Sequence, residues 1–173
     1  MIHCPAPQTP KTAYQADWQA TAMAWRGACL DLYSRTEAAL DDCIAELECL
    51  GCALGRDSHH PGAKARHRAL ALFLGKGGFT CHDAATARKL ADWAELAEER
   101  AWFAHGTMKV TGQGVVFMLS THDGSRRLGP ETRAFSRIEM VAWLRRIASA
   151  KTELASQLGQ IRAEAKRRGK RAA

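Results

Sequence analysis

Apolar positions between residues 14 and 53 recur at the spacing of an α-helix. They form two neighbouring stripes, one made of Leu30, Tyr33, Leu40, Ile44 and Leu47 and the other of Trp18, Trp25, Cys29, Leu32, Ala39, Cys43 and Leu50. Side chains three and four residues apart lie on the same side of a helix. The pattern therefore predicts one long helix whose wide apolar face can pack against two partner helices.

Three further helical patterns follow this segment. Residues 64–74 predict a short helix that ends at a run of glycines, Gly75-Lys-Gly-Gly. Thr80-Cys-His-Asp83 has the spacing of a capping box, in which an acidic residue stands three positions after a Thr or Ser. It predicts a third helix that reaches residue 104, with a buried stripe formed by Leu90, Trp93, Ala97, Ala101 and Ala104.

A second capping box, Ser136-Arg-Ile-Glu139, predicts the start of a last long helix. We expect this helix to extend to about residue 168. Its apolar stripe keeps heptad-like spacing and consists of Met140, Leu144, Ile147, Leu154, Leu158 and Ile161.

The hydrophobic period changes between the third helix and the last one. Residues 108–111 and 115–121 are rich in β-branched and other apolar side chains, and Gly112-Gln-Gly114 separates them. Such a pattern predicts a β-hairpin over about 107–122. Asp123-Gly124 is a second turn signal, so a third strand is expected at 126–135.

These elements predict a mainly α fold, a four-helix up-down bundle with a small β-hairpin between the third and fourth long helical segments. Residues 13–161 are expected to form a single domain. A flexible leader with three prolines precedes it at 1–12, and a basic tail follows it at 162–173.

Composition places the chain among ordinary globular proteins, with 46% apolar and 25% charged residues. No apolar run is long enough to span a membrane, and no secretory signal pattern stands at the N-terminus. Four of the six cysteines lie in or at the end of the first helical pattern, where they cannot bridge one another. We therefore expect reduced thiols and a cytoplasmic location.

The net charge of +7 is concentrated towards the C-terminus, where residues 162–173 hold six basic side chains and one acidic one. A basic tail favours polyanions through counterion release, which would make the chain a nucleic-acid-binding protein. The alternative is that these residues are a frayed, solubilising helix end.

The third helical pattern delivers an arginine and a histidine to its last turns, in the order Arg100-x4-His105-Gly106. Gly106 lets the chain leave the helix, so His105 is expected at the helix end. This pair at a helix end is the most function-like feature of the sequence. The alternative is that Arg100 pairs with a glutamate on the surface and His105 is a polar helix-terminal residue.

The order long helix, short helix, helix ending in Arg-x4-His-Gly, hairpin and long helix resembles the HEPN (higher eukaryote and prokaryote nucleotide-binding) domains. The resemblance covers roughly residues 18–161. It implies a homodimer that binds RNA and cuts it without a metal or cofactor. His105 would act on the ribose 2′-OH and Arg100 would hold the scissile phosphate. One departure is Ala101, where active members usually carry a polar side chain.

The resemblance also implies partners, and two alternative roles stay open. Many such proteins are toxins or defence factors that an antitoxin neutralises, for example a small nucleotidyltransferase. The first alternative is a non-catalytic HEPN-like interaction module, which Ala101 favours. The second is a basic protein that binds nucleic acid through its tail.

Other side chains near the Arg–His motif and in the tail are candidate RNA contacts, namely Trp102, Arg126, Arg127, Arg133, Lys166, Arg167 and Arg168. Trp102 could stack on a base or bury against the hairpin. A separate cluster, Cys49 and Cys52 with His59 and His60, offers a weaker alternative as a zinc site. Cysteines in an apolar helical run are more often small core residues.

Overall fold

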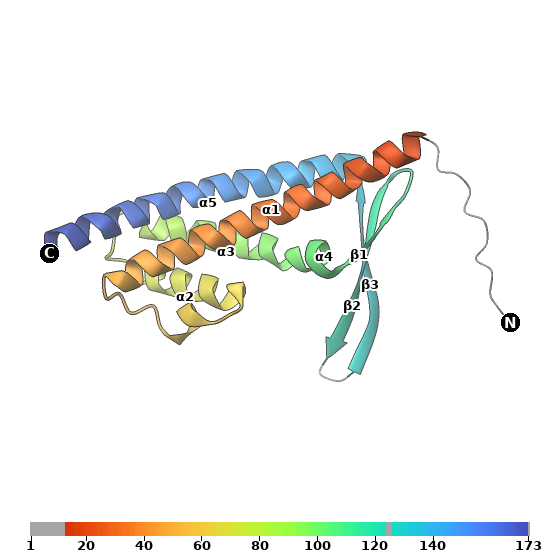
Figure 1. The fold of residues 1–173 in the computed structure, drawn as a ribbon. Helices are drawn as coiled ribbons and strands as arrows, with labels where there is room; N and C mark the ends of the chain where they lie inside the picture. Colours follow the sequence, from red (N-terminus) through yellow and green to blue (C-terminus); the bar gives the residue numbers. More distant parts are fainter. Residues whose placement is uncertain (1–12, 124–125, 173) are drawn as a thin grey trace.

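The computed structural model describes residues 13–123 and 126–172 of the chain. Its elements follow in the order α1 (Ala13–Cys49), η1 (Arg56–His59), α2 (Ala63–Gly75), α3 (Asp83–Glu98), α4 (Arg100–His105), β1 (Thr107–Val110), β2 (Gly114–Asp123), β3 (Arg126–Ser136) and α5 (Arg137–Ala172) (Figure 1). The described part is mainly helical with a small three-stranded antiparallel sheet, as the sequence predicts.

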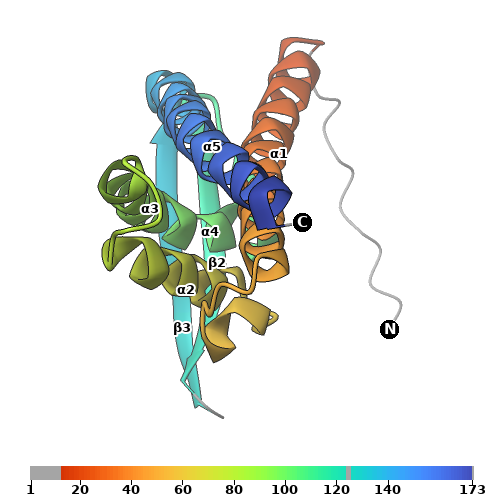
Figure 2. The same cartoon turned by 90° about the vertical axis from the view of Figure 1, so that its left-hand side faces the viewer.

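The two longest helices, α1 and α5, lie side by side, and α2, α3 and α4 pack beneath them (Figures 1 and 2). Two contacts between α1 and α5 show that these helices run parallel. The Trp25 indole donates to the Met140 carbonyl near their starts, and Glu46 pairs with Lys166 towards their ends. The predicted up-down alternation is therefore not confirmed. After α1 the chain turns through η1 and α2, and α3 and α4 carry it back to the end where α1 begins. The sheet then leads into α5 (Figure 1).

The core contains a cluster of aromatic side chains and a row of buried residues along α1, which we call the seam. Along α1 the seam residues recur in steps of three and four, and all are buried: Ala22, Trp25, Cys29, Tyr33, Thr36, Leu40, Cys43 and Leu47. Both predicted stripes contribute to this seam, as expected for a helix that contacts two partners. Burial raises the pKa of the Cys29 and Cys43 thiols to about 12, so both stay protonated at neutral pH. All described cysteines are free.

Hydrogen bonds of the capping residues fix where α3 and α5 begin. The Ser136 amide donates to the Glu139 carboxylate and the Glu139 amide donates to the Ser136 hydroxyl, at 2.7 and 3.3 Å. This is the predicted capping box, and it opens α5. At α3, the Asp83 carboxylate accepts hydrogen bonds from the amides of Phe79 and Thr80, so the start of α3 is held by the predicted acid.

The predicted third helix is divided at Glu99 into α3 and α4. The Glu99 and Trp102 amides donate to carbonyls only three residues back, which tightens the helix at this point. The predicted buried stripe is therefore wrong in its second half. Ala97, Ala101 and Ala104 are partly exposed, and Leu96 and Phe103 take the buried positions instead.

The sheet confirms the hairpin and the third strand, with strand order β1-β2-β3. It lies across the end of the molecule where α1 and α5 begin (Figure 1). Val115, Phe117 and Phe135 point into the core. Thr111 accepts and donates hydrogen bonds with Gly114 at the first turn, and the Trp18 indole donates to the Thr111 carbonyl.

Gly114 is expected to be intolerant of a side chain. A Cβ at this position would overlap the carbonyl oxygen of Phe135 on β3, whereas a Cβ at Gly112 would have nothing within 4 Å. Because backbone cannot move aside cheaply, we expect Gly114→Ala to lower the free energy of unfolding by about 1–3 kcal/mol. Urea denaturation of Gly114→Ala beside the control Gly112→Ala would measure this, and equal midpoints would contradict it.

The segment at 162–173, which was expected as a separate tail, continues α5 as far as Ala172. Ile161 and Ala165 are buried on the bundle side of this last part. Over the two described stretches, no helix is both long enough and apolar enough to span a bilayer.

Candidate functional site

Arg100 and His105 stand at the two ends of α4, and the chain turns into β1 directly after His105. Gly106 makes this turn possible because a Cβ there would overlap the carbonyl oxygen of Trp102 and crowd the Phe117 ring. The residue after the histidine must therefore be glycine. The side chain of His105 is exposed, and it has no hydrogen-bond or ion-pair partner within 13–123 and 126–172.

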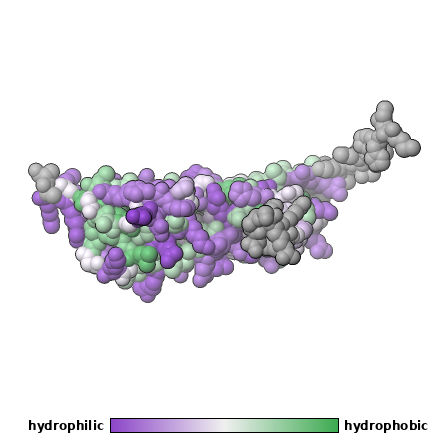
Figure 3. Space-filling view, turned by 90° about the horizontal axis from the view of Figure 1, so that it is seen from below, coloured by the Kyte–Doolittle hydropathy of each residue, from purple (hydrophilic) through white to green (hydrophobic). Residues whose placement is uncertain are grey.

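Both side chains line one groove of about 540 Å³, which we call the α2–α3 groove. Its wall and floor come from α2, α3 and α4, with one residue from α1: Glu37, Gly62, Ala63, Lys64, His67, Arg68, Ala71, Leu90, Ala91, Ala94, Ala97, Glu98, Arg100, Ala101 and His105. Alanines dominate the floor, and charged side chains surround it. In Figure 3 apolar surface gathers over the end of the molecule where Figure 1 places α2 and α3.

Arg100 is held by Glu37, a residue of α1. Its Nε lies 3.0 Å from Glu37 Oε1, and the side chains are 38% and 22% exposed. The N–H is not directed at the oxygen, so the contact is an ion pair and not a hydrogen bond. Exposed pairs of this kind contribute little stability, and a phosphate arriving in the groove could compete for the guanidinium.

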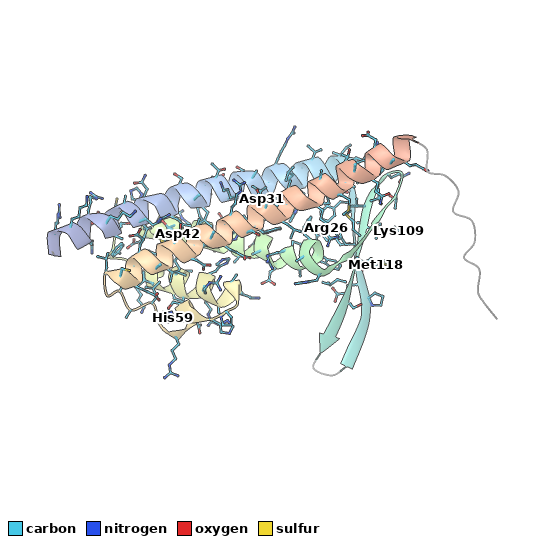
Figure 4. The ribbon with its side chains drawn as sticks, viewed as in Figure 1. Arg26, Asp31, Asp42, His59, Lys109 and Met118 are labelled. Atoms are coloured by element: carbon cyan, nitrogen blue, oxygen red, sulfur yellow. The ribbon has the colours of Figure 1, made fainter. Side chains whose placement is uncertain are left out.

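The end of α4 is held by Arg26 of α1. The Arg26 Nε donates to the Phe103 carbonyl at 2.7 Å, and its guanidinium lies over the Phe117 ring. Figure 4 shows Arg26 where α1 approaches α4 and the sheet. A cation on one of the last carbonyls satisfies a group that a helix end leaves unpaired. Arg26 thereby fixes the helix end that carries His105.

His67 of α2 is the most buried polar side chain of the groove. It is 6% exposed, and its Nε2 has no hydrogen-bond partner in the described structure. Burial, helped by the neighbouring Arg66 charge, lowers the pKa of His67 from 6.5 to about 4. At neutral pH the groove wall therefore contains an uncharged imidazole.

His67 is expected to make stability depend on pH. Its folded pKa lies below its unfolded value, so the unfolded chain binds the proton more readily. The contribution is complete above about pH 6.5 and is lost as the pH falls towards 4, by about 3 kcal/mol at most. Urea denaturation at pH 7.5 and pH 4.5 would measure it in the wild type and in His67→Leu. An equal loss of stability in both proteins would contradict this assignment.

Two of the other predicted RNA contacts near the motif, Trp102 and Arg133, do not join the groove. Trp102 is half-buried against the hydrophobic core. Arg133 pairs with Glu99 at 2.6 Å and lies over the Phe135 and Trp143 rings, on the side facing α5. Arg126 and Arg127 are in β3, but their side chains lie outside the described residues.

The predicted tail contacts are in ion pairs at the far end of α5. Lys166 pairs with Glu46 at 3.2 Å, and Arg167 and Arg168 pair with Glu164. The Arg168 guanidinium also lies over the Phe79 ring. Lys166 and Arg168 therefore join α5 to neighbouring segments, whereas Arg167 pairs within α5, and all three lie at a distance along the bundle from Arg100 and His105.

The alternative zinc residues are not gathered into one site. Cys49 and Cys52 lie at and after the end of α1. The Gly62 amide donates to His60 Nδ1. The Nε2 of His59, which is labelled in Figure 4, lies 3.4 Å from Glu48 Oε1. Among the described residues, no three His, Cys, Asp or Glu side chains lie close enough together to hold a metal ion.

No protein-family model matches this chain, and no curated protein or solved structure matches it significantly. Its function must therefore be argued from the groove itself.

Sequence reasoning found Arg100 and His105 but missed Glu37, His67 and Arg68, which share the groove with them. Glu37 is a polar position of a long amphipathic helix, like several others on α1. His67 falls in a short helix with a weak apolar pattern. No local signal separates either residue from ordinary surface positions, because only packing brings α1, α2 and α4 together.

Proposed function

We propose that this protein is a HEPN-like homodimer that binds RNA and cleaves it without a metal, through Arg100 and His105 of both protomers. The supporting observation is that the two side chains line one open groove, with His105 exposed and unpartnered in the described structure. An imidazole free of internal hydrogen bonds can exchange protons with a substrate. The mainly helical fold with its small antiparallel sheet supports the same proposal by analogy.

The proposed reaction is an attack of the ribose 2′-oxygen on the adjacent phosphorus. One His105 takes the proton of the 2′-OH, the bond from phosphorus to the 5′-oxygen breaks, and the leaving oxygen receives a proton from the other His105. Arg100 holds the phosphate oxygens on which negative charge develops. The products are a 2′,3′-cyclic phosphate and a free 5′-hydroxyl, and DNA is not cut because it lacks the 2′-OH.

The groove adds two features to this proposal. Glu37 keeps the Arg100 guanidinium oriented in the empty groove, so little side-chain freedom remains to be lost when a phosphate binds. Ala101 lines the groove between Arg100 and His105 and offers no polar atom. The polar chemistry is therefore assigned to Arg100 and His105 alone.

The first test is direct. The purified full chain, free of contaminating nuclease, is incubated with a single-stranded RNA and with the same sequence as 2′-O-methyl RNA and as DNA, in the presence of a metal chelator. We expect cleavage of the RNA alone, with 2′,3′-cyclic phosphate ends identified by mass spectrometry. Cleavage that requires a metal, or none at all, would contradict the catalytic part of the proposal.

An interaction module without catalysis is the second candidate, and Ala101 together with the Glu37–Arg100 ion pair favours it. On this view the pair is simply part of a surface that contacts a partner protein such as an antitoxin. The expected result is then no RNA cleavage by the wild type, with partner binding that survives the loss of His105.

A further inference from the structure

The α2–α3 groove continues well past Arg100 and His105. Ala91 and His105 both line it and are fourteen positions apart along α3 and α4. At the rise of an α-helix this separation corresponds to about 20 Å. The groove therefore has a charged end, at Arg100 and His105, and an apolar end between α2 and α3.

We propose that the apolar end, floored by Ala71, Ala91 and Ala94 beside His67, seats a nucleobase of single-stranded RNA, while another nucleotide of the same strand places its phosphate at Arg100 and His105. This inference rests on the proposed function and adds the base to the site that holds the phosphate. A flat ring needs an apolar slot with few polar groups, which is the usual character of a small-ligand pocket. The groove volume of about 540 Å³ falls within the range of such pockets.

His67 supplies the polar group of this slot. It lines the groove, is more than nine-tenths buried, and leaves Nε2 without a partner in the described part of the chain. Buried polar groups normally have a hydrogen-bond partner. This nitrogen has almost no accessible surface in the described structure, so it gains a partner from a ligand only if the slot opens around the base. Because burial keeps the His67 pKa near 4, the ring is neutral and can donate at one nitrogen and accept at the other. The edge of a nucleobase offers donors and acceptors for both.

The charges around the slot fit a strand of nucleotides. Arg68 lines the groove one residue from His67, is exposed, and has no ion-pair or hydrogen-bond partner among the described residues. With Arg100 it places guanidinium cations at two points along the groove. Phosphates on either side of a seated base could therefore both be contacted.

The same groove is a poor fit for a helix of a partner protein. Lys64 of α2 and Glu98 of α3 both line it, and Lys64 Nζ lies 2.5 Å from Glu98 Oε1, so this pair joins the two walls. A helix with side chains is about 10–12 Å wide and would have to break this pair to lie in the groove. A flexible RNA strand that inserts a single nucleobase does not have to break it.

The test uses the full chain and two fluorescent 2′-O-methyl oligoribonucleotides, which cannot be cleaved, one with all bases and one fully abasic. Fluorescence anisotropy gives both affinities. We expect the wild type to bind the base-containing strand about tenfold more tightly, the order expected for burying one ring. Ala94→Leu fills the slot at an exposed helix position, so it should remove this preference and leave the abasic affinity unchanged. Ala91→Leu should do the same.

The matched control is Ala84→Leu, an exposed alanine of α3 that does not line the groove, and it should keep the full preference. His67→Phe keeps a ring and removes the nitrogens, so it should reduce discrimination among adenine, cytosine and uracil strands. Equal affinity of the wild type for both strands, or a preference that survives Ala94→Leu, would overturn the base seat. If RNA is nevertheless cleaved, the proposed function stands without it, whereas binding of neither strand overturns both.

Discussion

His105→Ala is expected to lower the rate of RNA cleavage by about 10²–10⁴-fold, the usual contribution of a positioned general acid or base. The imidazole is exposed and has no partner within the described residues, so its removal should not disturb packing. Arg100→Ala should lower the rate by about 10²–10³-fold, because it removes the cation opposite the developing phosphate charge. Cleavage of a fluorogenic RNA under single-turnover conditions measures both effects.

Two comparisons make this result specific to the motif. Arg88→Ala removes an exposed arginine of α3 that does not line the groove, and it should cut at the wild-type rate. His105→Ala should still bind uncleavable RNA with an affinity close to that of the wild type, since the guanidinium groups of Arg68 and Arg100 remain in the groove. Unchanged cleavage in both motif variants would assign the activity to a contaminant and leave the interaction module as the better function.

Phe103→Ala is expected to lower the free energy of unfolding by about 3–5 kcal/mol. Phe103 is fully buried on α4, and its ring lies 5.3 Å from the ring centroids of Trp25 and Phe117 and 6.4 Å from that of Trp143. It therefore joins α1, the sheet and α5 to the helix that carries the motif. Such a loss is a large part of the roughly 5–15 kcal/mol that stabilises a domain.

Urea denaturation followed by far-UV circular dichroism would measure this loss. Leu72→Ala is the control, because Leu72 is 57% exposed on α2 and its truncation should change stability by no more than about 0.5 kcal/mol. If Phe103→Ala unfolds at 37 °C, Phe103→Leu keeps much of the volume and should show a smaller loss in the same direction. A Phe103→Ala protein as stable as Leu72→Ala would mean that α4 is not anchored through this ring.

Phe103 also shows where a periodic pattern fails. Counting in steps of three and four from Leu90 and Trp93 leads to Ala97, Ala101 and Ala104. The buried positions are instead Leu96, which precedes the tightened turn at Glu99, and Phe103, which follows it. The alanines then face outwards, and two of them line the groove. A one-residue change in helical phase thus moved small side chains from the predicted core to the candidate site. Aromatic burial gains more than alanine burial, which decides the phase.

The amino-acid sequence alone determined the local structure of this protein, because caps, turns and helical stripes depend on residues within a few positions of one another. The capping box at Ser136, the turn at Gly112-Gln-Gly114 and the placing of His105 at a helix end followed by Gly106 are of this kind. Tertiary structure decided the parallel direction of α1 and α5, the contact of Glu37 with Arg100 and the burial of His67 in the groove. These depend on how surfaces distant in the chain pack together, and no spacing within a single helix encodes that.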